Sequence, residues 1–246
     1  MRLMKWQIWL GLVLILLSVS LYLLHYALFQ DAHHIWIFLV GDIAFVPIEV
    51  LLVTLIIHRL LSVREKRSLL NKLNMVIGTF YSEVGTVLLK RLSAFDPHSQ
   101  QISKDLIPTT DWTDREFSQL LQKLKAYEYT IDYRRGDLKG LKDFLFKKRP
   151  FLLSLLENPN LLEHDSFTNL LWAVFHLAEE LTHRHDVKGL CDSDYQHLCG
   201  DIKRVYALLV SEWIDYMSHL KKAYPYLFSL AMRTNPFDPD ASPEIK

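Results

Sequence analysis

The hydrophobic positions of this chain are concentrated near its N-terminus. Residues 6–24 contain no charged side chain, and residues 35–57 contain only two, Asp42 and Glu49. A membrane-spanning helix needs about 20 predominantly apolar residues. Both segments therefore predict membrane spans, which pair as a helical hairpin over residues 1–57. A cleaved signal peptide is the competing interpretation of the first segment, although its apolar run is longer than usual for such a peptide.

The pattern after the hairpin has helical spacing. Apolar residues recur at alternating steps of four and three from Leu69 to Val87. This spacing predicts a long juxtamembrane helix over 58–93, which packs either as a coiled coil or as a core helix of the following domain. Residues 94–110 hold two prolines among polar side chains and predict a linker. The last segment, 233–246, holds three prolines and predicts a disordered tail.

Residues 111–232 predict a helical domain. Thr113 and Glu116 have the spacing of a capping box, and Ser193 and Gln196 repeat it. Capping residues, prolines and glycine predict helices over about 113–129, 137–146, 151–157, 165–184, 193–223 and 226–232. No segment shows the alternation of a strand, so the predicted fold class is all-α: a two-span transmembrane hairpin, a long juxtamembrane helix and a cytoplasmic helical bundle.

Charge strengthens this division of the chain. The 28 basic and 28 acidic residues balance overall, but residues 1–57 hold only two basic and three acidic ones. A net charge of zero argues against a nucleic-acid partner. Lys and Arg precede the first span and follow the second, whereas the connector between the spans has none. The positive-inside rule then predicts a multi-pass membrane protein with cytoplasmic N- and C-termini.

The two acids of the second span are its sharpest chemical feature. Asp42 and Glu49 lie seven residues apart, so both project from one face of a helix. A charge near the bilayer centre costs at least about 2.5 kcal/mol, and such carboxylates face protein or water rather than lipid. Folding the hairpin about residue 30 places Ser18 level with Asp42. These residues predict either an ion-binding or pore site in an oligomer, a proton relay, or polar contacts that hold helices together.

In this layout both ends of the hairpin face the inside, and the acids of the second span follow the outside turn. The layout resembles the pore of the mitochondrial calcium uniporter family. That family carries a Trp-Asp-x-x-Glu-Pro run, whereas this chain has Gly41-Asp42, then Pro47, then Glu49. The resemblance implies a cation pathway through an assembly of several chains.

A second cluster of candidate ligands lies in the helical domain. His176, Glu179, Glu180 and His183 include the Glu-x-x-His spacing of metal sites in helical bundles. They predict a site for a divalent cation. The competing interpretation is a solvated helix face, because at 100° per residue all four lie opposite the apolar stripe that begins at Phe167.

A basic segment with interleaved aromatic residues precedes this cluster. Its cations are Arg134, Arg135, Lys139, Lys142, Lys147, Lys148 and Arg149. In a protein held at the cytoplasmic leaflet, such a segment suits anionic lipid headgroups. The alternative is an ordinary polar helix face.

No motif in the chain specifies a reaction. The sequence lacks a phosphate-binding glycine loop, a Gly-x-Ser-x-Gly elbow and a His-Glu-x-x-His helix. We therefore expect a non-enzymatic membrane protein that oligomerises with itself and acts as a scaffold, signalling protein or sensor, with the lipid bilayer and a cytoplasmic protein as partners. The alternatives are an oligomeric cation channel or ion sensor, and a membrane-anchored protein that binds a divalent metal.

Overall fold

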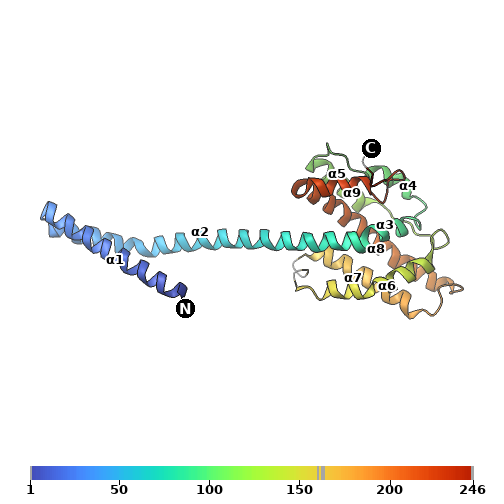
Figure 1. Ribbon diagram of the computed structural model, residues 1–246, viewed down its shortest axis with the longest axis horizontal. Helices are drawn as coiled ribbons and strands as arrows, with labels where there is room; N and C mark the ends of the chain where they lie inside the picture. Colours follow the sequence, from blue (N-terminus) through green and yellow to red (C-terminus); the bar gives the residue numbers. More distant parts are fainter. Residues whose placement is uncertain (1, 160, 162–163, 245–246) are drawn as a thin grey trace. The chain divides into compact units, whose positions relative to one another are not determined.

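The computed structural model describes residues 2–159, 161 and 164–244 and divides the chain into two compact units, residues 1–66 and 67–246. Every regular element in this described part of the chain is a helix (Figure 1), which confirms the all-α fold class. The boundary between the units falls within one helix, α2. Each unit is therefore described by itself.

The first unit contains helix α1 (Arg2–Phe29) and the beginning of α2 (Ala32–Phe80). Two stretches in these helices, Ile8–Phe29 and Ala32–Arg64, are long and apolar enough to cross a membrane by length and composition. None of the apolar side chains in these stretches is buried within the chain. Apolar surface of this extent is stable only when something other than water covers it.

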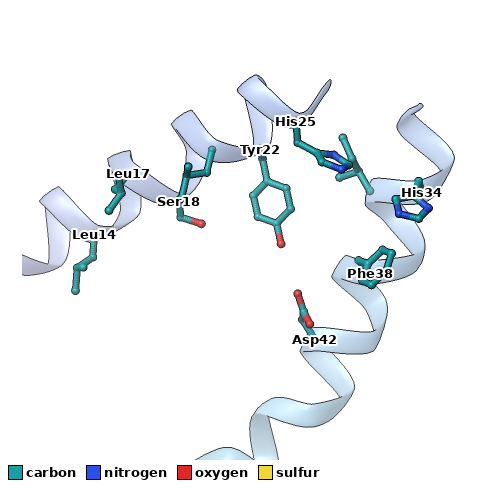
Figure 2. A pocket seen from close by; sticks show the side chains of 10 residues that line it. Leu14, Leu17, Ser18, Tyr22, His25, His34, Phe38 and Asp42 are labelled. Carbon is teal, nitrogen blue, oxygen red and sulfur yellow. The ribbon is translucent and has the colours of Figure 1, made fainter. Parts of the chain in front are cut away.

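A two-residue turn joins the helices of this unit. Gln30 adopts a φ of 50°, and the Asp31 carboxylate accepts a hydrogen bond from the backbone N–H of His34 at 3.1 Å, which caps the start of α2. Next to the turn, the rings of His25 and His34 stack with centroids 6.0 Å apart (Figure 2). The turn therefore brings imidazoles from α1 and α2 together at one end of the hairpin.

The second unit begins with the last turns of α2, which continue as the π-helix η1 (Tyr81–Gly85) and then as α3 (Thr86–Ser93). In η1 the backbone N–H of Thr86 bonds to the carbonyl of Tyr81, five residues back. Leu73 and Phe80 are buried in the core of this unit. These two residues belong to the apolar pattern predicted from Leu69 to Val87 and pack within this unit, as a core helix would, whereas Val87 is exposed. The side chain of Leu69 lies outside the described residues.

Helix α8 (Asp192–Ala223) is the central element of this unit. The helices α3, α5 (Asp114–Ala126), α7 (Asp165–His183) and α9 (Pro225–Arg233) all pack against it, and α6 (Leu138–Leu156) packs on α7 (Figure 1). Burial of apolar residues on several faces of α8 explains this position: Ile202, Tyr206 and Ile214 are fully buried.

Two of the local predictions about helix ends differ from the structure. Thr113 and Glu116 do form a capping box at the start of α5. Ser193 and Gln196 do not, because α8 begins one residue earlier, after Cys191, with no side-chain cap. Helix α6 also runs through Pro150, where a break was predicted. Pro150 is exposed, so the carbonyl that loses its hydrogen-bond donor can be hydrated instead.

The described residues of the predicted linker and of the predicted tail form short helices and long-range contacts that the sequence pattern did not indicate. Residues 94–110 contain the short helices α4 (Ser99–Ser103) and η2 (Lys104–Leu106), and Phe95 is buried with them. In the C-terminal segment, the amide of Asn235 donates a hydrogen bond to the carbonyl of Leu106 at 2.9 Å. Scattered aromatic and amide side chains thus anchor segments whose proline content suggested disorder.

Candidate functional site

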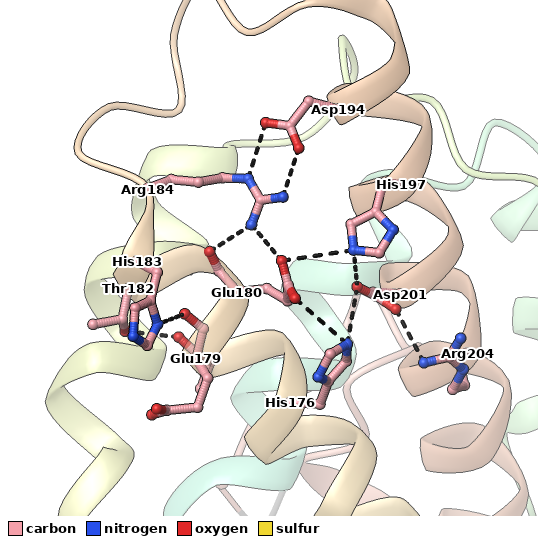
Figure 3. A network of polar contacts seen from close by, with 11 residues as sticks. His176, Glu179, Glu180, Thr182, His183, Arg184, Asp194, His197, Asp201 and Arg204 are labelled. Carbon is pink, nitrogen blue, oxygen red and sulfur yellow. Dashed lines mark hydrogen bonds and ion pairs between the residues drawn. The ribbon is translucent and has the colours of Figure 1, made fainter.

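The adjacent helices α7 and α8 each present a histidine followed four residues later by a carboxylate. On α7 these are His176 and Glu180, and on α8 they are His197 and Asp201. Residues four apart lie on the same face of a helix, one turn from each other. Because α7 and α8 pack together, the two pairs meet at the edge of their interface (Figure 3), and we refer to these four residues as the imidazole–carboxylate cluster.

Asp201 lies at the centre of the cluster. Its Oδ2 atom is 3.5 Å from Nε2 of His176 and 3.3 Å from Nε2 of His197. The side chain is only 3% exposed, and Oδ2 has no hydrogen-bond partner among the described residues. The remaining carboxylate, that of Glu180, is 3.9 Å from the first imidazole and 3.6 Å from the second. A buried carboxylate oxygen therefore faces two imidazole nitrogens.

These separations suit a small metal ion. One ligand atom each from His176, His197 and Asp201 lies within 4.8 Å of the others. Ligands bound at 2.0–2.1 Å around a tetrahedral ion are about 3.3 Å from one another. The distances from Asp201 to the imidazoles already match this value, and the Glu180 carboxylate lies beside the same two nitrogens. Two imidazoles and two carboxylates form a donor set typical of Zn²⁺ and neighbouring transition metals.

Arginines hold both carboxylates of the cluster in place. Arg184 donates from Nη1 to Glu180 at 2.6 Å and also binds Asp194 through two bonds of 2.6 and 3.0 Å. The Arg184 guanidinium lowers the pKa of the Glu180 carboxyl, so this acid stays charged in mildly acidic solution. Arg204 donates to the other oxygen of Asp201 at 3.0 Å. Outer hydrogen bonds of this kind orient the ligands of metal sites.

The structure separates the four ligands predicted on α7. His176 and Glu180 face α8, whereas Glu179 accepts a 2.5 Å hydrogen bond from Arg149 of α6. The Nδ1 atom of His183 lies 2.8 Å from the carbonyl oxygen of Glu179, away from the cluster. The face opposite the apolar stripe is therefore not uniformly solvated, because two neighbouring helices divide it between them.

Sequence reasoning missed His197 and Asp201. The signal that could have found them is the repeated spacing, His-x-x-x-Glu on α7 and His-x-x-x-Asp on α8, on consecutive helices. The search for Glu-x-x-His spacing instead favoured His183.

The structure divides the basic segment into paired and free cations. Lys142 donates to the carbonyl of Arg184, and Lys148 forms an ion pair with Glu83 at 2.9 Å. Arg149 pairs with Glu179 and lies over the ring of Phe175. The exposed cations are Arg134, Arg135, Lys139 and Lys147. These four would be the first to reach lipid headgroups in the predicted contact, whereas Lys142, Lys148 and Arg149 are engaged with other residues of the domain.

The structure also divides the residues predicted for the hairpin. Ser18 and Asp42 line the same cavity of about 590 Å³ between α1 and α2, together with Tyr22 (Figure 2). Glu49 does not line it. The predicted set for an ion pathway is therefore not gathered at one place within a single chain.

Comparison with known proteins identifies relatives of both units. Residues 2–61 match a family model described as "MJ1433, N-terminal helical domain", and residues 69–233 match one described as "Uncharacterized protein MJ1433, C-terminal helical domain". The chain is 45% identical over 235 residues to "Uncharacterized protein MJ1433" of Methanocaldococcus jannaschii, which covers 95% of this chain and 94% of that protein. No solved structure matches.

Proposed function

The chain belongs to the MJ1433 family, and we propose that it is an integral membrane protein whose C-terminal helical unit binds a divalent transition-metal ion. The observation that carries this proposal is the pair of His-x-x-x-carboxylate sequences that meet around the buried Oδ2 of Asp201. The ligands come from two helices, so ion binding would tie α7 to α8. The protein would then act as a membrane-anchored metal sensor and not as an enzyme.

Metal titration of the full chain tests this function. We expect wild-type protein, purified in mild detergent without an affinity tag, to bind one Zn²⁺ per chain by isothermal titration calorimetry. His197→Ala should weaken binding by at least the 10–100-fold that changes next to metal ligands already cause. His183→Ala is the matched control, because it removes a histidine of α7 that lies outside the cluster. Equal affinities for the two variants would contradict the proposal.

The membrane placement forms the second part of the proposal. Two apolar helices support it, and the lack of Lys and Arg between them supports a hairpin with both termini in the cytoplasm. Cys191 offers a natural reporter for this topology, since it is an exposed, free thiol. The hydroxyl of Ser193 beside it lowers the pKa of this thiol, which favours the reactive thiolate. A membrane-impermeant maleimide should label Cys191 in inverted vesicles and leave it unlabelled in intact cells; labelling in intact cells would refute the orientation.

A second candidate function is cation passage through an oligomer. The observation that favours it is the exposure of Asp42 and Glu49 on an otherwise apolar helix, because intramembrane acids normally face protein or water. We expect proteoliposomes to show cation flux that the double variant Asp42→Asn, Glu49→Gln abolishes. Equal background leak from both preparations, or a monomer in nanodiscs, would eliminate this candidate. The exposed arginines and lysines of the 134–149 segment would contact anionic headgroups in either case.

A further inference from the structure

The cavity between α1 and α2 combines apolar walls with one carboxylate group. On α1 it is lined by Leu14 and Leu17, followed by Ser18 and Tyr22. On α2 the Asp42 carboxylate lines its inner end, and in Figure 2 the hydroxyl of Tyr22 points toward this carboxylate. The volume of about 590 Å³ is large enough for a compact organic molecule.

The position of Asp42 places the charge deep in the predicted span. Asp42 follows Ile35, the first residue of the predicted span, by seven positions, or about 10 Å along the helix axis. This depth lies inside the hydrocarbon core, which is about 30 Å thick. His34 and Phe38 lie on the same face at spacings of four, between the turn and the carboxylate. The cavity therefore extends from the imidazoles at the turn to an acid inside the predicted span.

The chain supplies no lysine or arginine beside this acid, and the imidazole of His34 stands eight residues, or about 12 Å along α2, from Asp42. No Lys or Arg occurs between Lys5 and Arg59. A second copy of the chain would bring the same segment, and with it another Asp42 instead of a positive charge. The acyl chains of lipids are also uncharged at this depth. The complementary occupant must therefore carry its own positive charge on an apolar body.

We propose that this cavity is a binding site for lipophilic organic cations. The charged centre of the ligand would lie beside the Asp42 carboxylate, and its apolar groups would pack against Leu14, Leu17 and Phe38. Ligands that also carry N–H groups would donate them to the carboxylate and to the hydroxyl of Ser18. The proposal rests on the membrane placement argued above but not on the metal site.

Tetraphenylphosphonium is a suitable probe, because it joins one positive charge to four apolar rings. Equilibrium binding of the radiolabelled cation is measured to the full chain in nanodiscs. We expect saturable binding by wild type and at least tenfold weaker binding by Asp42→Asn. Asp42→Glu keeps a carboxylate in the cavity, and Glu49→Gln removes the other acid of the predicted span, which lies outside the cavity. Both should bind within threefold of wild type.

The results that would overturn the inference are equally specific. If Asp42→Asn binds tetraphenylphosphonium as tightly as wild type, the Asp42 carboxylate does not hold the cation. If Glu49→Gln loses as much affinity as Asp42→Asn, the cation is attracted to any acid in the membrane and not to this cavity. Wild-type binding no greater than that of empty nanodiscs would exclude the site. Should Asp42→Asn fail to fold, Ser18→Trp, which fills the cavity, provides the same test with the carboxylate intact.

Controls separate this site from the function proposed above. Asp201→Asn lies in the other unit and should bind tetraphenylphosphonium as wild type does. Resistance of the protein to alkaline carbonate extraction from membranes reports the placement independently. If the protein stays in the membrane in alkaline carbonate but does not bind the cation, only the proposed binding site is refuted. If carbonate extracts the protein, both the membrane placement and the binding site are refuted.

Discussion

Replacing Asp201 with Asn changes the buried carboxylate that lies between the two imidazoles of the cluster. The carboxylate is 3% exposed, and its Oδ2 lies within 3.5 Å of both Nε2 atoms. An Asn amide has nearly the same shape, and its oxygen can still accept the hydrogen bond from Arg204. It carries no negative charge, however, and is a weaker ligand for a transition metal. We therefore expect the variant to fold and to lose its response to metal.

The size of that response follows from linkage. A ligand present at 100 times its Kd stabilises the native state by about 2.7 kcal/mol. The second unit has about 180 residues, which gives an unfolding entropy of about 0.38 kcal/mol/K. Saturating Zn²⁺ should therefore raise the Tm of this unit by about 7 °C. If Asp201→Asn weakens binding 100-fold, the same Zn²⁺ concentration should raise Tm by only about 1 °C.

Thermal unfolding followed by circular dichroism at 222 nm, with Zn²⁺ and with EDTA, measures both shifts. At pH 5.5 the increase in wild-type Tm on adding Zn²⁺ should shrink, because an imidazole binds metal only in its unprotonated form. Glu180 should not cause this loss, since Arg184 lowers the pKa of that carboxyl. A shift in Asp201→Asn equal to that of wild type, with His183→Ala also unchanged, would refute the assignment of Asp201 as a ligand.

Three further predictions concern stability and are tested by chemical denaturation of the full chain in detergent. Burial raises the pKa of Glu212, so folding favours the protonated form of this acid, and its ionised form destabilises the protein increasingly as pH rises above about 4.5. Glu212→Gln should therefore stabilise the protein more at pH 8 than at pH 4.5, and a pH-independent difference would contradict this. Phe80→Ala should lower the free energy of unfolding by about 3–5 kcal/mol, because Phe80 is fully buried and its ring centroid lies 5.3 Å from that of Phe167. A decrease below 1 kcal/mol would show that this contact is absent. Asn235→Ala should lower the free energy of unfolding by about 1–3 kcal/mol, because it leaves the carbonyl of Leu106 without its hydrogen-bond donor. An unchanged free energy of unfolding would show that the C-terminal segment is not anchored there.

The helical elements were predictable from the sequence because their apolar spacing is regular. The pattern over residues 165–184 predicted α7 (Asp165–His183) almost to its ends, and the capping box of Thr113 predicted the start of α5. The failures come from long-range contacts. Neither the linker nor the tail has regular spacing, and each is held by single side chains such as Asn235 that reach another segment. A sequence pattern cannot show a partner 129 residues away.

Half of the candidate metal site was predictable for the same reason. His176 and Glu180 stand on one helix at a recognisable spacing, so sequence reasoning placed them in the cluster. Their partners on α8 could be assigned only once the packing of α7 on α8 was known. The angular position of Glu179 did not reveal that Arg149 would pair with it, because α6 approaches from another part of the chain.

The π-helix η1 also affects how the chain tolerates length changes. A π-turn contains one residue more than an α-helical turn at the same place. The side chains of the helices before and after it still point in the directions they would have without the extra residue. Deleting Ser82, an exposed residue within Tyr81–Gly85, would let this turn close as ordinary α-helix without rotating α3 relative to the end of α2. A one-residue deletion elsewhere in these helices would turn every following side chain by about 100° out of the core. Natural or engineered variants one residue shorter should therefore have their gap at this segment.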